Sequence, residues 1–238
     1  MIVLCLVCWR SKQLITNESN KLFYGKYLYR LEINNHLARF FREKNLPQAK
    51  FVLDSLQGQI DSGMSEKLTV RRGLRHIQVP YDEFIDAVKL YSSFITADDY
   101  KLRVSYSFLN IYANNLDWLK DIANQINSNK VYGLWKPNEK YITSLKQKNV
   151  ILVNEGNGYQ YKVTFGNGRG EESFIKWADA NPNLIKVGPR LKEELEAQGY
   201  VNGMYFYARD EKTLSLCNLV TSNIRRIDKL LVKSDLDK

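Results

Sequence analysis

The chain has 238 residues, 44% of them hydrophobic and 12% aromatic, which is enough apolar material for one large or two small folded domains. It carries 35 Lys and Arg against 26 Asp and Glu, a formal net charge of +9, and this balance favours polyanionic partners such as nucleic acid. Its three cysteines, Cys5, Cys8 and Cys217, exclude the dense disulfide framework of small secreted domains and fit a reducing cytoplasm.

Residues 2–9 are apolar throughout and contain Cys5 and Cys8 at C-x-x-C spacing. Because no second Cys/His pair with ligand spacing follows, we interpret both cysteines as small hydrophobic residues of a buried strand or an apolar extension, and we expect no metal and no cofactor. The stretch has no basic segment before it and is too short to span a bilayer, so we expect neither a secretory signal nor a membrane anchor, and a cytoplasmic location.

The first half of the chain alternates expected strands and helices. A short strand at 14–16 and an alternating strand at 22–33 predict a hairpin-like pair, with Tyr27 and Tyr29 on the inward face. Capping residues and apolar spacing predict helices at 36–44, 48–57, 80–96 and 116–126. Further strands are expected at 67–79, 101–113 and 130–135.

The second half begins after a connector at 138–149. Strands at 150–154 and 159–166 predict a hairpin around the Gly156-Asn157-Gly158 turn. Helices are expected around Phe174, at 189–198 and from the Asp210 cap to about 223; strands are expected at 203–209 and 225–232, before a loose tail at 233–238.

Three blocks of the second half repeat blocks of the first half in the same order. Leu14–Asn20 resembles Ile151–Asn157, Tyr27–Leu31 resembles Tyr159–Val163, and Ile111–Asn115 resembles Phe206–Asp210. We interpret this as an internal duplication. The separation of matched residues falls from 132 (29 to 161) to 95 (112 to 207), a difference of 37 residues, which we assign to an insertion at about 58–100 of the first copy.

The repeat predicts an α+β fold made of two hairpin–helix–βαβ units, broadly ferredoxin-like, with mixed or antiparallel sheets. The first copy would span 1–137 and the second 150–238, on either side of the connector.

The sequence shows no catalytic signature: it has no P-loop, no G-x-S-x-G and no H-E-x-x-H, and only two histidines, His36 and His76. We therefore expect a protein that is not an enzyme. The loop at 166–170 is rich in glycine and could cradle phosphate, although a flexible loop explains it as well. Acidic pairs at 82–83, 98–99 and 171–172 could help to hold magnesium, but two of them fit first helical turns better.

Basic residues next to the repeated tyrosines, and one dense basic cluster, are the candidates for phosphate contacts: Lys26, Arg30, Lys162, Arg71, Arg72 and Arg75. They favour a non-enzymatic nucleic-acid-binding or replication-accessory protein with DNA or RNA as its partner. Two alternatives are a structural or assembly protein, which would contact a second copy or another protein, and a divergent metal-dependent nuclease.

The segment from Tyr24 to Arg30 resembles uncharacterised proteins encoded by bacteriophages and other viruses, which implies a phage or mobile-element origin but no function. The duplicated size, basic charge and β-α-β segments also resemble monomeric LAGLIDADG homing endonucleases. Their paired helix motif, which ends in an acidic metal ligand, is missing here, so no catalytic residue is carried over.

Overall fold

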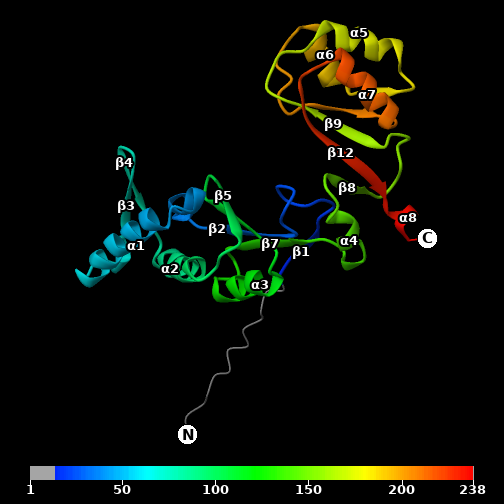
Figure 1. Cartoon of the computed structure of the whole chain (residues 1–238). Coiled ribbons are helices and arrows are strands. Elements are labelled where there is room, and N and C mark those ends of the chain that lie inside the picture. Colours follow the sequence, from blue (N-terminus) through cyan, green and yellow to red (C-terminus); the bar gives the residue numbers. More distant parts are fainter. Residues whose placement is uncertain (1–13, 238) are drawn as a thin grey trace. The chain divides into compact units, whose positions relative to one another are not determined.

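The computed structural model describes residues 14–237 and divides them into two compact units (Figure 1). The first unit contains residues 14–19 and 26–137, and the second contains residues 20–25 and 138–237. The apolar stretch at 2–9, with Cys5 and Cys8, lies outside the described residues. Within residues 14–237, no helix has the length and apolar character needed to cross a membrane.

The first unit is built on a five-stranded mixed sheet. Its strand order is β1 (Thr16–Glu18), β7 (Val131–Lys136), β2 (Tyr29–Asn34), β6 (Phe108–Ala113) and β5 (Tyr100–Ser105). β1 runs parallel to β7, and every other neighbouring pair is antiparallel.

Helices cover one face of this sheet, as Figure 1 shows. They are the 3-10 helix η1 (Ala38–Lys44), α2 (Tyr81–Ile95) and α3 (Leu116–Gln125), while α1 (Leu46–Asp61) packs against η1 and α2. Leu31 and Ile33 of β2 and Ile111 of β6 pack with Phe84 and Leu119 of the helices in one core. Side chains that alternate with these strand residues therefore project from the opposite face.

Two expected strands of the first unit are in fact hairpins. The first is the expected strand at 67–79. It contains β3 (Thr69–Arg72) and β4 (Arg75–Gln78), which are joined by a two-residue turn and preceded by the short 3-10 helix η2 (Ser65–Lys67). Gly73 has φ +61 in that turn, a conformation that glycine adopts without strain. The expected strand at 101–113 is likewise split into β5 and β6 by a turn at Tyr106, where φ is +56.

The second unit has a sheet of the same design, in the order β10 (Ile185–Val187), β11 (Tyr205–Ala208), β9 (Tyr161–Phe165), β12 (Ile224–Val232) and β8 (Val150–Val153). β8 is parallel to β12 and the other pairs are antiparallel. The helices α5 (Glu172–Ala180), α6 (Pro189–Glu196) and α7 (Glu211–Val220) cover the face that carries Val163 and Phe206.

A smaller cluster in the second unit includes the connector, and the tail that follows β12 corrects one expectation. The connector at 138–149 is ordered as η3 (Glu139–Tyr141) and α4 (Ile142–Leu145), and Tyr141 and Leu145 pack against Val150 and Leu152. The tail is not loose: it forms α8 (Lys233–Leu236), and Asp237 accepts hydrogen bonds from Lys140 Nζ at 2.9 Å and Tyr141 Oη at 3.0 Å.

The two sheets share one topology, which confirms the duplicated α+β fold. Without β1, the first sheet has the ferredoxin-like strand order 4-1-3-2; without β8, so does the second. Tyr29 lies opposite Ala113, and Tyr161 lies opposite Ala208. The separations of 132 and 95 residues found in the sequence therefore describe equivalent positions in the two sheets.

The two predicted hairpins at the start of the copies are wrong in one respect. β7 lies between β1 and β2, and β12 lies between β8 and β9, so strands adjacent in sequence are not partners. The βαβ crossover through α3 or α7 returns the last strand into this gap, where both of its edges form hydrogen bonds.

The extra elements of the first unit lie between β2 and β5. There α2 packs against α3 and leads directly into β5, as α5 packs against α7 and leads into β10. Because α2 thus has a counterpart, the additional elements are η1, α1, η2 and the β3–β4 hairpin. They occupy residues 38–78, which begin earlier than the expected range of 58–100.

Candidate nucleic-acid interface

Each sheet carries a cation–tyrosine–cation row on the face that points away from its helices. In the first unit the row consists of Arg30, Tyr112 and Lys101, which lie opposite one another on β2, β6 and β5. In the second unit Lys162, Tyr207 and Lys186 occupy the equivalent positions on β9, β11 and β10. The duplication has therefore kept the chemistry of this face as well as its backbone.

In the first unit the row continues into a stacked pair. The Arg30 guanidinium carbon lies 3.6 Å from the centroid of the Trp135 ring, a distance typical of a strong cation–π contact. Trp135 fits close to its strand because a Cβ atom at Gly133 would lie only 3.3 Å from the indole ring. Tyr112 lies between Arg30 and Lys101 in this row and is buried, with 5% of its surface exposed.

In the second unit the stacking partner is a tyrosine. Lys162 Nζ lies 3.6 Å from the centroid of Tyr205, whose ring is 43% exposed and lies edge-on to Tyr207 at 5.6 Å. Burial lowers the pKa of Lys162 from its ordinary value, and the neighbouring cation of Lys21 acts in the same direction. An anion that approaches Lys162 would therefore stabilise the charged form of its side chain.

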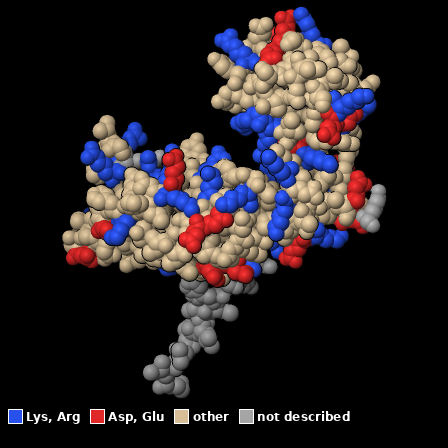
Figure 2. All heavy atoms as spheres, in the orientation of Figure 1, with Lys and Arg blue, Asp and Glu red and all other residues tan. Residues whose placement is uncertain are grey.

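Two further cations on these faces have no acidic partner among the described residues, whereas the acids are paired with arginines: Glu32 Oε2 lies 3.9 Å from the Arg30 guanidinium. Arg103 and Lys186 are exposed and form no ion pair with any residue in the described part of the chain. Asp228 lies opposite Lys162, but it is buried and binds Arg226 at 2.7 Å. The two faces therefore present net positive charge between aromatic rings. Figure 2 shows Lys and Arg side chains gathered where β9 and β12 lie.

The basic cluster of the first unit lies at the end of the β3–β4 hairpin, away from the sheet face. Arg71 lies opposite His76, and Arg72 lies opposite Arg75, on either side of the turn. Arg71 and Arg75 are exposed, and Arg71 Nε donates to the Gly73 carbonyl at 3.0 Å. Figure 2 shows basic side chains gathered around this hairpin.

Lys26 does not belong to the row, although the sequence pattern placed it on the same strand face as Arg30. β2 begins only at Tyr29, and Lys26 lies in the turn before it. Its Nζ is 2.5 Å from Asp99 Oδ1, and this hydrogen bond raises the pKa of the lysine. Of the six candidates, Arg30 and Lys162 lie on the sheet faces, and the three arginines at 71, 72 and 75 lie on the hairpin.

The repeated tyrosines lie mainly on the inward side, as the sequence indicated. Tyr27 is buried, and Tyr29 and Tyr161 pack against the cores of their units. Tyr159 differs: its ring lies 6.3 Å from Tyr207.

The sequence pattern did not reveal the other members of the two rows, which are Lys101, Tyr112, Lys186 and Tyr207. It also did not reveal the stacking partners Trp135 and Tyr205. Alternation at Tyr205-Phe206-Tyr207 is a usable signal, because it separates an outward pair of tyrosines from an inward phenylalanine. Their neighbours across the sheet could not be inferred without the strand order.

The glycine-rich loop at 166–170 uses its amides within the fold. Gly166 N donates to the Asn223 carbonyl at 2.9 Å, and Gly170 N donates to the Gly199 carbonyl at 2.8 Å. A Cβ atom at Gly168 would lie 2.7 Å from the Asn223 side chain. The loop is therefore packed against its neighbours, which is a structural reason for its glycines.

The acidic pairs are separated in the structure. Asp82 and Glu83 lie in the first turn of α2, Glu171 is the N-cap of α5 with Glu172 in its first turn, and Asp99 is paired with Lys26. Over residues 14–237, no three His, Cys, Asp or Glu side chains come together as a metal site would require. His36 Nδ1 lies 2.7 Å from Glu83 Oε2.

Comparisons with known proteins give no further lead: no family model matches the chain, and neither a search of curated proteins nor a search of solved structures finds a match.

Proposed function

We propose that this protein binds single-stranded nucleic acid, DNA or RNA, on the open faces of its two sheets, as a non-enzymatic accessory protein in a process such as replication. The observation that carries this proposal is the cation–tyrosine–cation row, which occurs at equivalent positions in both units. If each sheet face only had to be soluble, the two units would have no reason to keep the same order of side chains.

In the second unit the row and its neighbour Tyr205 provide the two interactions that single-strand binding requires, whereas in the first unit, where Tyr112 is buried, the row provides cations. Arginine and lysine neutralise backbone phosphates, and aromatic rings stack on unpaired bases without regard to sequence. Tyr205 is the best placed stacking residue, because it is 43% exposed and lies beside Lys162. Bases of a duplex already stack on each other, so a flat sheet face with exposed rings favours a single strand.

Equilibrium binding to a labelled single strand of DNA and of RNA, measured across a salt series, tests the proposal. We expect the logarithm of affinity to fall linearly with the logarithm of salt, by about 0.7 for each phosphate contact. Arg103→Ala and Lys186→Ala should each reduce this slope by about 0.7. Tyr205→Ala should weaken binding about tenfold, with little change in slope, because it removes stacking and not charge.

Control substitutions on the second unit separate these effects from general loss of charge or aromatic surface. Arg190→Ala removes an exposed cation of α6, and Tyr200→Ala removes a tyrosine that is 68% exposed outside the sheet. Both should leave affinity within about twofold of the wild type. Failure to bind any strand at low salt, or equal losses for Tyr205→Ala and Tyr200→Ala, would contradict the proposal.

A further inference from the structure

The β3–β4 hairpin is anchored at its base and unsupported at its end. Leu68 and Val79 flank the hairpin and are buried in the core of the first unit. Gln59 of α1 fixes the first residue of β3, because its side chain bonds both the Thr69 amide and the Thr69 carbonyl at 2.9 Å. Four residues per strand extend about 13 Å, which is more than the depth of the DNA major groove, about 8.5 Å.

The end of the hairpin combines cations with a fully exposed apolar residue. Leu74 occupies the turn with 95% of its surface exposed, and Arg75 and His76 beside it are also exposed. A single exposed leucine is ordinary on a protein surface. A leucine at the end of a basic two-stranded ribbon is different, because a partner that covers it also meets the neighbouring cations and gains from carrying negative charge.

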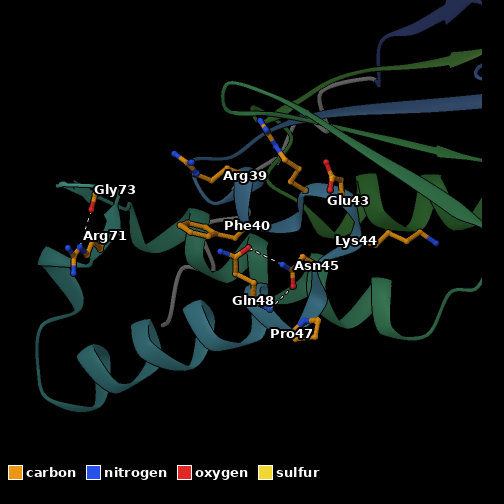
Figure 3. A pocket seen from close by; sticks show the side chains of 10 residues that line it. Arg39, Phe40, Glu43, Lys44, Asn45, Pro47, Gln48, Arg71 and Gly73 are labelled. Carbon is orange, nitrogen blue, oxygen red and sulfur yellow. Dashed lines mark hydrogen bonds between the residues drawn. The ribbon is translucent and has the colours of Figure 1, made fainter.

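A pocket of about 660 Å³ lies between the hairpin and the corner at which η1 meets α1. Arg39, Arg42 and Arg71 line it, with Glu43 as the acid among its lining residues. Figure 3 shows Arg39 and Arg71 bordering the space beside the Phe40 ring, whereas Lys44 points away. Lys44 Nζ instead lies 3.6 Å from the centroid of Tyr100.

The backbone at this corner is strained. Glu43 and Lys44 are consecutive residues with φ of +55 and +58, in the left-handed region that non-glycine residues rarely adopt. This conformation ends η1 sharply, so that Arg39 and Arg42 remain beside the hairpin. The corner thus holds Arg39 and Arg42 of η1 close to Arg71 of β3.

We infer that the β3–β4 hairpin engages the end of a nucleic-acid duplex, with Leu74 wedged against the terminal base pair and the arginines of the hairpin and pocket on backbone phosphates. This inference rests on the proposed nucleic-acid binding and adds a second, duplex-specific site. Apolar side chains such as leucine unstack base steps when a basic element holds the backbone on both sides. The first unit would then recognise a junction, with the single strand on its sheet and the duplex at its hairpin.

A forked DNA with 2-aminopurine in the last base pair before the fork tests this wedge. Binding of the wild-type protein should raise the fluorescence, because the base loses its stacking partner. Leu74→Ala should abolish the rise and weaken fork binding about tenfold, while single-strand affinity stays within about twofold. Arg75→Ala should reduce the salt slope for the fork by about 0.9 and leave the single-strand slope unchanged.

Leu219→Ala is the matched control for the wedge, because Leu219 of α7 is apolar and 82% exposed. It should behave as the wild type, as should Arg190→Ala in the salt series. A fluorescence rise that Leu74→Ala retains, or no rise with the wild-type protein, overturns the wedge while single-strand binding stands. If no nucleic acid binds at low salt, the proposed function fails first, and this inference fails with it.

Discussion

Glu83 is a buried carboxylate that joins three segments of the first unit. It accepts hydrogen bonds from the His36 backbone N–H at 2.6 Å, from the His36 ring at 2.7 Å and from Lys130 Nζ at 2.5 Å. Burial by itself would raise the pKa of Glu83, but these three donors outweigh it, and the net pKa lies below the ordinary value of 4.5. The residue therefore connects the end of β2, the start of α2 and the segment before β7 through its charge.

We expect Glu83→Gln to lower the free energy of unfolding by about 2 kcal/mol at pH 7, because the amide keeps the shape but loses the charge that Lys130 faces. A carboxylate whose folded pKa is depressed stabilises the fold above its unfolded pKa and loses this effect as the pH falls through the folded value. The difference between wild type and variant should therefore shrink below about pH 4.5. Urea denaturation across a pH series measures it.

Glu172→Gln serves as the control, since Glu172 is exposed and pairs with Lys176, four residues along α5. Its stability should match that of the wild type. A stability difference for Glu83→Gln that is the same at pH 3 and pH 7 would show that the charge of Glu83 is not what stabilises this junction.

At the scale of elements, the helices that complete the two βαβ crossovers begin with the same device. Asn115 Oδ1 accepts from the Trp118 amide at 3.0 Å at the start of α3, and Asp210 Oδ1 accepts from the Thr213 amide at 2.8 Å at the start of α7. The two caps are 95 residues apart, as are the strand positions that precede them. Hydrogen bonds from Thr213 hold the pKa of Asp210 below its ordinary value.

We expect Asn115→Ala to destabilise the first unit by about 1 kcal/mol, because an amide in the first turn of α3 loses its acceptor. Asp210→Ala should destabilise the second unit for the same reason. Thermal unfolding followed by circular dichroism measures both losses. Asn115→Ser and Asp210→Ser, which keep an acceptor oxygen, should recover most of the stability; if they do not, the caps do not act through this hydrogen bond.

At the scale of the whole molecule, the two large cores of the described residues have no shared member. One contains Leu31 and its helical neighbours, and the other contains Val163, which occupies the equivalent strand position. Units with separate cores commonly unfold as separate cooperative blocks.

Calorimetry of the full chain should therefore show two unfolding transitions. Leu31→Ala should lower the midpoint of one by removing about 3 kcal/mol of core packing, and Val163→Ala should lower the midpoint of the other. A single transition that both substitutions shift equally would contradict this independence.

The sequence by itself determined the duplication, the outward and inward faces of the strands around Tyr29 and Tyr161, a cap at Asn114 or Asn115 and a cap at Asp210, because these depend on residues close together in the chain. Only the tertiary structure decided that β7 and β12 enter the gaps next to β2 and β9, and that Arg30 stacks on Trp135 while Lys162 stacks on Tyr205. These partners are separated by 105 and 43 positions in sequence. Strand pairing at such distances is set by which edges remain free and which apolar faces can be buried together, and no local pattern of residues contains that information.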